Sequence, residues 1–412
     1  MSELTVADKH VKSLKELYLI SIGHGFTHWY PATFYLLLPV IGKELGLSYG
    51  QIGFIMTFQF IVTSLFNVPG GMLVDLVRRK GMLMAISLLW VGIPYFLMSF
   101  TNSYVMLLLC VALVGMGNNL WHPTAISTLS QRYPERKGFA LSIHGMGANI
   151  GDALAPLTIG ALLGLLGWKQ VVVWNIIPGV ALAAVVMISL RTLRPPGSVI
   201  VSDKKTLSAK GFISDFGQLV KNKSLIFIST SSAFRSMTQN ALLTYLPLYL
   251  AYSIKLDPFW VGFSMFALQA FGFIAAPISG NLSDRLGRKK IVMTSMLMTG
   301  VILVAMGFAG QSNFFVVFIA LLGFFLFAVR SVMQAWLMDI TPKQMAGTSV
   351  GLLFGMQSFG SSISPLVGGL IADRYGLNAT FYFIACTIMI ANLMVFLIPE
   401  RAKNSVNNTI SG

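Results

Sequence analysis

The strongest constraint in this sequence is a succession of long apolar runs, each long enough to cross a lipid bilayer as a helix. A transmembrane helix needs about 20 predominantly apolar residues, and twelve such runs can be recognised in the 412 residues. They are residues 16–42, 50–76, 81–101, 104–129, 139–167, 170–191, 225–252, 258–281, 290–310, 313–339, 348–371 and 378–398. Only 10% of the residues are charged, against about 25% in soluble domains. We therefore expect an all-α membrane protein.

The basic residues of the loops predict an orientation. With the N-terminus inside, 23 Lys and Arg residues fall on the inner side and four on the outer side, namely Lys43, Lys169, Lys255 and Arg374. This asymmetry predicts that both termini are cytoplasmic. It also accounts for the net charge of +15, so no nucleic-acid partner is expected. We expect a multi-pass protein of the plasma membrane, a bacterial inner membrane, in contact with lipids.

Two halves of the chain repeat at one offset. Gly71, Asp75 and Arg79 match Gly280, Asp284 and Arg288, each pair 209 residues apart. The repeat predicts two six-helix bundles, residues 1–191 and 225–412, joined by a polar cytoplasmic linker at 192–224. Duplicated halves are typical of secondary transporters, in which the substrate site lies between the repeats near the middle of the membrane.

The repeated loop carries a family resemblance. The stretch from Gly280 to Lys289, GNLSDRLGRK, resembles the signature loop of the major facilitator superfamily, and the copy from Gly71 to Lys80 is degenerate. In that family the loop holds the cytoplasmic side closed. The resemblance implies gating roles for Gly71, Asp75, Arg79, Gly280, Asp284, Arg285, Gly287 and Arg288, with Arg136, Arg132 or Lys137 as a basic partner. The alternative is a topology signal without a gating role.

Two further resemblances suggest export. The glycines of Gly147–Gly160 resemble the antiporter motif of the family, and small residues at this spacing let helices pack closely. Residues 115–151, which include Trp121-His122-Pro123, and Ser21–His24 resemble the fosmidomycin-resistance branch of exporters. Where that branch has Asn-Asp, this chain has Thr27-His28.

Polar residues inside apolar runs are costly and mark functional sites. Four pairs at i,i+4 spacing occupy the first, fourth, seventh and tenth runs, and each pair shares one helix face. By the family resemblance, these four helices line the central cavity. The candidate substrate-binding residues are His24, His28, Asn118, Trp121, His122, Arg235, Gln239, Arg330 and Gln334. Phe26, Trp29, Trp121, Phe234 and Trp336 are candidates for an apolar wall.

The charge of these residues predicts the substrate class. Arg235 and Arg330 keep their protons, and Asp152 is the one acid well inside the runs. The cavity is thus net positive and suits a small anionic or zwitterionic organic substrate with an apolar portion. Alternatively, an arginine pairs with Asp152 and serves only helix packing. The candidates for proton coupling are Asp152, His24, His28, His122 and His144, and we favour Asp152 with His144. We expect the proton gradient as energy source and no cofactor.

The sequence lacks the motifs of other classes of protein. There is no Gly-x4-Gly-Lys-Ser/Thr nucleotide loop. There is also no His-Glu-x-x-His, and the histidines are scattered along the sequence, so we expect neither an enzyme nor a metal site. We expect a monomer that exports its substrate by proton antiport. Import of an organic anion by proton symport, a uniporter and a transport-inactive receptor are the alternatives.

Overall fold

The computed structural model describes residues 2–77, 79–190, 221–309, 315–341 and 346–399. These residues form helices, and no strand occurs among them. The helices are α1 (Ser2–Glu44), α2 (Tyr49–Leu76), α3 (Lys80–Met98), α4 (Tyr104–Arg132), α5 (Lys137–Leu163), α6 (Trp168–Ser189), α8 (Lys223–Tyr252), α9 (Pro258–Leu286), α10 (Arg288–Ala309), α11 (Phe315–Ile340), α12 (Ala346–Tyr375) and α13 (Asn378–Phe396). Each predicted apolar run coincides with one of these helices.

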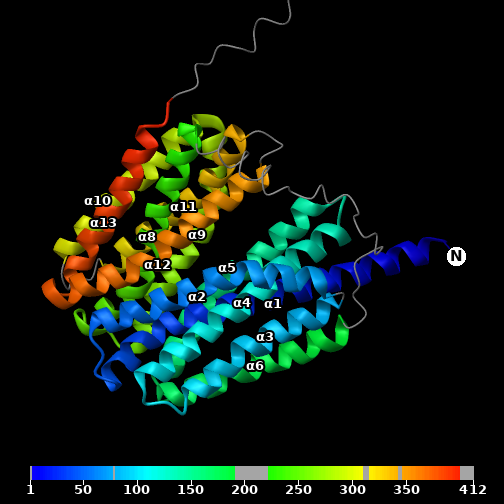
Figure 1. Cartoon of the computed structure of the whole chain (residues 1–412), viewed down its shortest axis with the longest axis horizontal. Helices are drawn as coiled ribbons and strands as arrows, with labels where there is room; N and C mark the ends of the chain where they lie inside the picture. The colour runs from blue at the N-terminus through cyan, green and yellow to red at the C-terminus, as the bar shows by residue number, and fades with distance from the viewer. Residues whose placement is uncertain (1, 78, 191–220, 310–314, 342–345, 400–412) are drawn as a thin grey trace, which may run out of the picture.

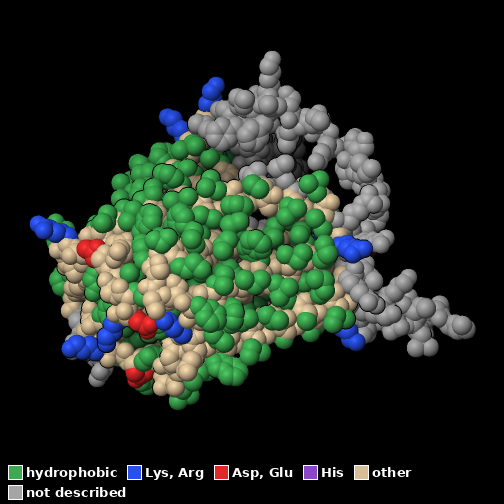
Figure 2. Space-filling model, turned by 60° about the horizontal axis from the view of Figure 1, so that its bottom comes forward, with side chains coloured by type: hydrophobic (Ala, Val, Ile, Leu, Met, Phe, Trp, Pro, Cys, Tyr) green, Lys and Arg blue, Asp and Glu red, His purple; other side chains and the backbone are tan. Residues whose placement is uncertain are grey.

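Most of the helices have the composition of membrane spans. Nine in the described part of the chain are long and apolar enough to cross a bilayer, and α1, α8 and α12 are not among them. α1 and α8 carry the polar pairs His24/His28 and Arg235/Gln239. On the face drawn in Figure 2, hydrophobic side chains predominate and the Lys and Arg side chains lie at the margins. The all-α membrane class is therefore confirmed, while twelve spans and cytoplasmic termini stay predictions.

The helices pack in two sets, α1–α6 and α8–α13, which lie on opposite sides of the view in Figure 1. In the first set α1 packs on α5, and α3 packs against α4 and α6. In the second, α8 packs against α12 and α13, and α9 packs on α11. The sets meet where α2 packs on α12 and α5 packs on α9. The predicted linker at 192–224 falls almost entirely outside the described residues.

The glycines of the α5 motif allow backbones to approach closely. A Cβ at Gly147 would lie 2.0 Å from the carbonyl oxygen of Ser21, and one at Gly151 would lie 2.0 Å from that of Gly25. Farther along α5, a Cβ at Gly160 would lie 2.6 Å from the carbonyl oxygen of Pro258. The motif thus joins α5 to α1 within one set and to α9 in the other, and the close packing expected from it is confirmed.

Hydrogen bonds between the two sets gather at one end of the molecule, which we call the closed end. The carboxylate of Asp373, on α12, accepts from the N–H groups of Tyr49 and Gly50 at 2.8 Å each. The Leu366 N–H donates to the Thr57 hydroxyl at 3.2 Å. The Tyr252 hydroxyl, on α8, donates to the carbonyl oxygen of Pro39, on α1.

At the opposite end, the recorded ion pairs lie within one set. Arg288 pairs with Asp284 at 2.5 Å and with Asp339 at 3.1 Å. Arg132 pairs with Glu16. Arg136 is exposed at the N-terminus of α5. In this conformation, therefore, the second signature loop is tied to its own helix set through Arg288.

Among the described glycines of the signature loops, Gly287 has a clear backbone role. Gly287 ends α9 with a φ of +95°, which disfavours any side chain. Among the described residues, a Cβ at Gly71 or Gly280 would meet nothing within 4 Å, so no other helix approaches these two glycines closely in this conformation. The Asp75 side chain lies outside the described residues, Arg79 and Arg285 are exposed, and the gating roles stay predictions.

Candidate functional site

A cavity of about 370 Å³ lies between the two helix sets. It is lined from α1, α4 and α5 on one side and from α8, α9 and α11 on the other. Six of the predicted substrate-binding residues are on its wall: His24, His28, His122, Gln239, Arg330 and Gln334. Asp152 lines it as well. Each of the four polar pairs predicted from the sequence thus contributes at least one residue to this cavity.

That neighbour is a second cavity of about 230 Å³, which shares Gln239 and Arg330 with the first and also contains Arg235. The Arg235 side chain is buried, and its Nη1 donates to the Gln239 Oε1 at 2.9 Å. Its Nε has no hydrogen-bond partner among the residues that the structure describes. Arg330 is exposed toward the cavities. In the described part of the chain neither arginine forms an ion pair, so the space between the sets carries unneutralised positive charge.

The one acid of the cavity has a different partner from those expected. Asp152 Oδ2 lies 3.0 Å from His28 Nδ1. Asp152 does not contact the His144 ring, since the Nδ1 and Nε2 atoms of His144 have no partner in the described structure, and the role of these two residues in proton coupling stays a prediction. The alternative in which Asp152 neutralises an arginine is not seen either. His28 is one helical turn beyond His24 on α1 and faces α5, which the sequence spacing alone does not reveal.

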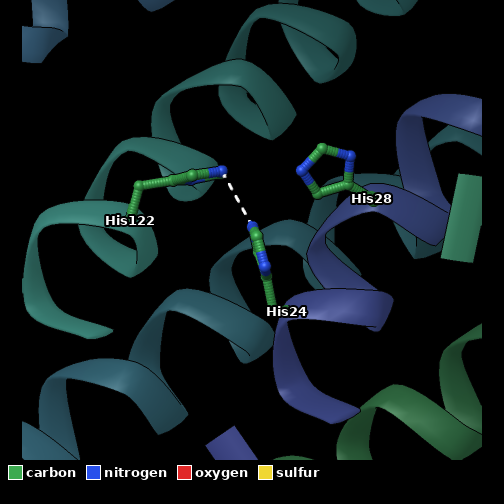
Figure 3. Close-up of side chains that lie close together, drawn as sticks. All are labelled: His24, His28 and His122. Carbon is green, nitrogen blue, oxygen red and sulfur yellow. Dashed lines mark hydrogen bonds between the residues drawn. The ribbon is translucent and has the colours of Figure 1, made fainter. Parts of the chain in front are cut away.

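Four histidines lie together on the first helix set. The His24 Nε2 is 3.2 Å from the His122 Nε2, and the His24 Nδ1 is 2.7 Å from the carbonyl oxygen of His144. The ring of His144 stacks on that of His24 with 3.8 Å between centroids. Figure 3 shows nitrogens of His24, His28 and His122 pointing toward one another. Histidines scattered along the sequence are therefore clustered in the structure.

Three predicted site residues do not line either cavity. Trp121 is fully buried among the first helix set, where a Cβ on Gly23 would lie 2.0 Å from its ring. The Asn118 Oδ1 is buried without a partner, and only its carbonyl oxygen contacts His122, at 3.1 Å. His144 lies behind His24. Trp121 is adjacent to His122 in sequence, but neighbouring residues on a helix point in different directions.

Three residues of the wall were not predicted from the sequence. Phe273 and Phe327 line the larger cavity, together with Gln269 of α9. Gln269 is the one amide side chain in the interior of the apolar run 258–281, and that position is a signal that could have identified it. Phe26 and Trp29, two of the expected wall aromatics, instead line a separate groove between α1 and α5.

Two bundles of apolar helices around a polar central cavity define the class of a membrane transporter. The family model of the Major Facilitator Superfamily matches residues 17–278 and 228–411, and the chain belongs to this superfamily. It is 25% identical to the fosmidomycin resistance protein of Escherichia coli (strain K12), over 93% of each chain. It is 24% identical to the probable nitrate transporter NarT of Staphylococcus aureus (strain Newman), over 95% of this chain and 97% of that one.

A solved structure shares the fold. The chain superimposes with a TM-score of 0.80 on a bacterial homologue of the human lysosomal transporter Spinster, in an inward-facing and unoccupied conformation, at 17% identity. The match covers 93% of this chain and 96% of that one. The chain is thus a multi-pass secondary transporter of small molecules, and the members of this family are not enzymes.

Proposed function

We propose that this protein moves a small organic anion, or a zwitterion with an anionic group, across a bacterial inner membrane by alternating access. The observation that carries the proposal is the pair Arg235 and Arg330, which line one cavity and form no ion pair in the described part of the chain. Arg235 is buried, and burying a cation without a counter-charge is unfavourable. A carboxylate, phosphate or phosphonate would accept from the planar guanidinium groups in a bidentate way.

The rest of the wall suits the remainder of such a substrate. Phe273 and Phe327 offer an apolar surface, and Gln239, Gln269 and Gln334 offer amide groups. Amides both donate and accept hydrogen bonds, which accommodates hydroxyl or amine substituents. The substrate class is therefore an anion that carries a short apolar or polar body, small enough for about 370 Å³.

We further propose that transport is export driven by the proton gradient. The α5 motif and the similarity to the fosmidomycin resistance protein favour this direction. Proton symport that imports an organic anion is the second candidate, since the nitrate transporter is similar over as much of the chain. Because the hydrogen bonds between the sets gather at the end predicted to be outside, we propose that the conformation is open to the cytoplasm.

The experiment is a binding and transport assay with matched arginine variants. In a thermal-shift screen of the purified protein, organic anions should stabilise it and cationic drugs should not. Arg235→Gln and Arg330→Gln should each weaken the binding of the best anion about 10- to 100-fold, since a hydrogen bond to a charged group contributes about 1.5–3 kcal/mol. Arg374→Gln, an exposed arginine at the closed end, is the control and should bind normally.

Two results would contradict the proposal. Unchanged anion binding in both cavity variants would show that the arginines do not bind the substrate. Stabilisation by cations alone would show that the substrate is not an anion. Proteoliposome flux with and without a pH gradient tests the coupling. Equal flux in both conditions would support a uniporter. If the flux depends on the pH gradient, the direction of the gradient that drives it distinguishes export by antiport from import by symport.

A further inference from the structure

Three histidines on the wall of the larger cavity direct one ring nitrogen each toward a common point. His24 and His28 come from α1, and His122 comes from α4 (Figure 3). Their nearest ring nitrogens all lie within 4.8 Å of one another. His24 is buried, whereas His28 and His122 are partly exposed and border the cavity. The substrate proposal, which rests on the arginines of α8 and α11, makes no use of this cluster.

Hydrogen bonds to the other nitrogen of each ring determine which tautomer is present. The His24 Nδ1 contacts the carbonyl oxygen of His144 at 2.7 Å. The His122 Nδ1 contacts the carbonyl oxygen of Asn118 at 3.1 Å. A carbonyl oxygen only accepts, so both Nδ1 atoms must carry hydrogen. The same holds for His28, whose Nδ1 donates to the Asp152 carboxylate at 3.0 Å.

In the neutral rings, the proton on Nδ1 leaves the lone pair on Nε2. All three Nε2 lone pairs are then unprotonated, and two of them, on His24 and His122, face each other at 3.2 Å. Two lone pairs at this distance repel unless a positive charge lies between them. The geometry therefore demands either a shared proton or a metal cation.

We propose that His24, His28 and His122 form a binding site for a divalent transition-metal ion. Zinc binds imidazole at about 2.0–2.1 Å in a tetrahedral arrangement, which places two ligand nitrogens about 3.3 Å apart. The His24–His122 separation of 3.2 Å already has this value. His28 has to move inward, and its ring borders the open cavity rather than a packed core.

The groups around the three rings orient them as in a metal site. Histidines that bind metals donate their remaining N–H to a carboxylate or a backbone carbonyl, which orients the ring and increases the basicity of the ligand. Here Asp152 does this for His28, and two backbone carbonyls do it for the others. Three nitrogens and no thiolate favour zinc, nickel, cobalt or copper over Mg²⁺ and Ca²⁺, which prefer oxygen.

The fourth coordination position faces the cavity. Three protein ligands with one open position leave room for water or for an oxygen of a bound molecule. Across the same cavity lies Arg330. An anion held by the arginines would be able to place an oxygen on the metal. The site therefore binds a divalent transition-metal ion, either alone or together with such an anion.

The test is metal titration of the purified full-length protein without a polyhistidine tag. Isothermal titration with ZnCl₂ should give one site per chain, and CoCl₂ should produce the intense visible absorption of four-coordinate cobalt. His122→Ala and His28→Ala should abolish both signals. Asp152→Asn, which removes the negative charge of the group that accepts from the His28 Nδ1, should weaken zinc binding about 10- to 100-fold. MgCl₂ should give no signal.

His144→Phe is the matched control, because it keeps a ring stacked on His24 but offers no metal ligand; it should bind zinc as the parent protein does. Arg235→Gln should also bind zinc normally, which separates this proposal from the anion proposal. Zinc binding that survives both His122→Ala and His28→Ala would overturn the proposal, as would the weak spectrum of six-coordinate cobalt. No zinc binding by the parent protein would also overturn it and would assign the charge between His24 and His122 to a shared proton.

Discussion

Replacing Asp373 should open the closed end of the transporter. Its carboxylate, on α12, accepts from the N–H groups of Tyr49 and Gly50 at 2.8 Å each. These are among the N–H groups that the first turn of α2 leaves without a partner inside the helix. The negative carboxylate also faces the positive end of the helix dipole. Because the donors and the acceptor belong to different helix sets, the contact is present only while this end is closed.

The magnitude follows from the geometry. Asparagine at position 373 would keep one acceptor oxygen and lose the charge and one of the two hydrogen bonds. A hydrogen bond to a charged group contributes about 1.5–3 kcal/mol, and a charge at a helix N-terminus about 0.3–1 kcal/mol. Since Asp373 is exposed, the lower ends apply, and they sum to about 2 kcal/mol. Asp373→Asn should therefore lower the ratio of closed to open conformations about 30-fold.

Distances between spin labels would measure this ratio. Labels at Lys43→Cys and Lys255→Cys lie on different sets near the closed end, in a background from which the free cysteines Cys110 and Cys386 have been removed. Double electron–electron resonance on the protein in nanodiscs should show a longer distance gaining population when Asp373→Asn is added.

Ser48→Ala is the matched control. The Ser48 hydroxyl accepts from the Gln51 N–H at 3.2 Å and caps the same helix from within its own set. Its loss should cost about 1 kcal/mol of stability without favouring either conformation. The reasoning would be refuted if Asp373→Asn left the distance distribution unchanged, or if Ser48→Ala shifted it equally.

Two further predictions concern packing inside the first helix set. Gly151→Ala should lower the melting temperature, because its Cβ would lie 2.0 Å from the Gly25 carbonyl oxygen and overpacking costs about 1–3 kcal/mol. Gly145→Ala, where a Cβ meets nothing within 4 Å, should raise it or leave it unchanged; equal losses in the two variants would contradict the argument. Trp121→Ala should destabilise the protein by about 3–5 kcal/mol, which a thermal-shift assay would detect as a lower melting temperature. A normal melting temperature together with weakened substrate binding would show instead that Trp121 contacts the substrate.

The sequence predicted which residues belong to the site more accurately than it predicted their partners. The i,i+4 spacing of Arg235 with Gln239 and of His24 with His28 placed each pair on one helix face, because the helical period determines this without any tertiary contact. The direction of a face relative to other helices is not local information. For this reason the sequence could not show that Asp152 contacts His28, or that Trp121 is buried within the first helix set.

The helical membrane fold was determined by the sequence itself, since a run of about 20 apolar residues can satisfy its backbone in a bilayer only as a helix. The duplicated halves, too, were visible as one constant offset between Gly71–Arg79 and Gly280–Arg288. Only the tertiary structure decided that His24, His28 and His122, up to 98 residues apart, direct their nitrogens to one point. It alone also showed that Asp373 joins α12 to the start of α2. Such contacts depend on how distant helices cross, and helix crossings are set by the packing of many side chains at once rather than by any local pattern.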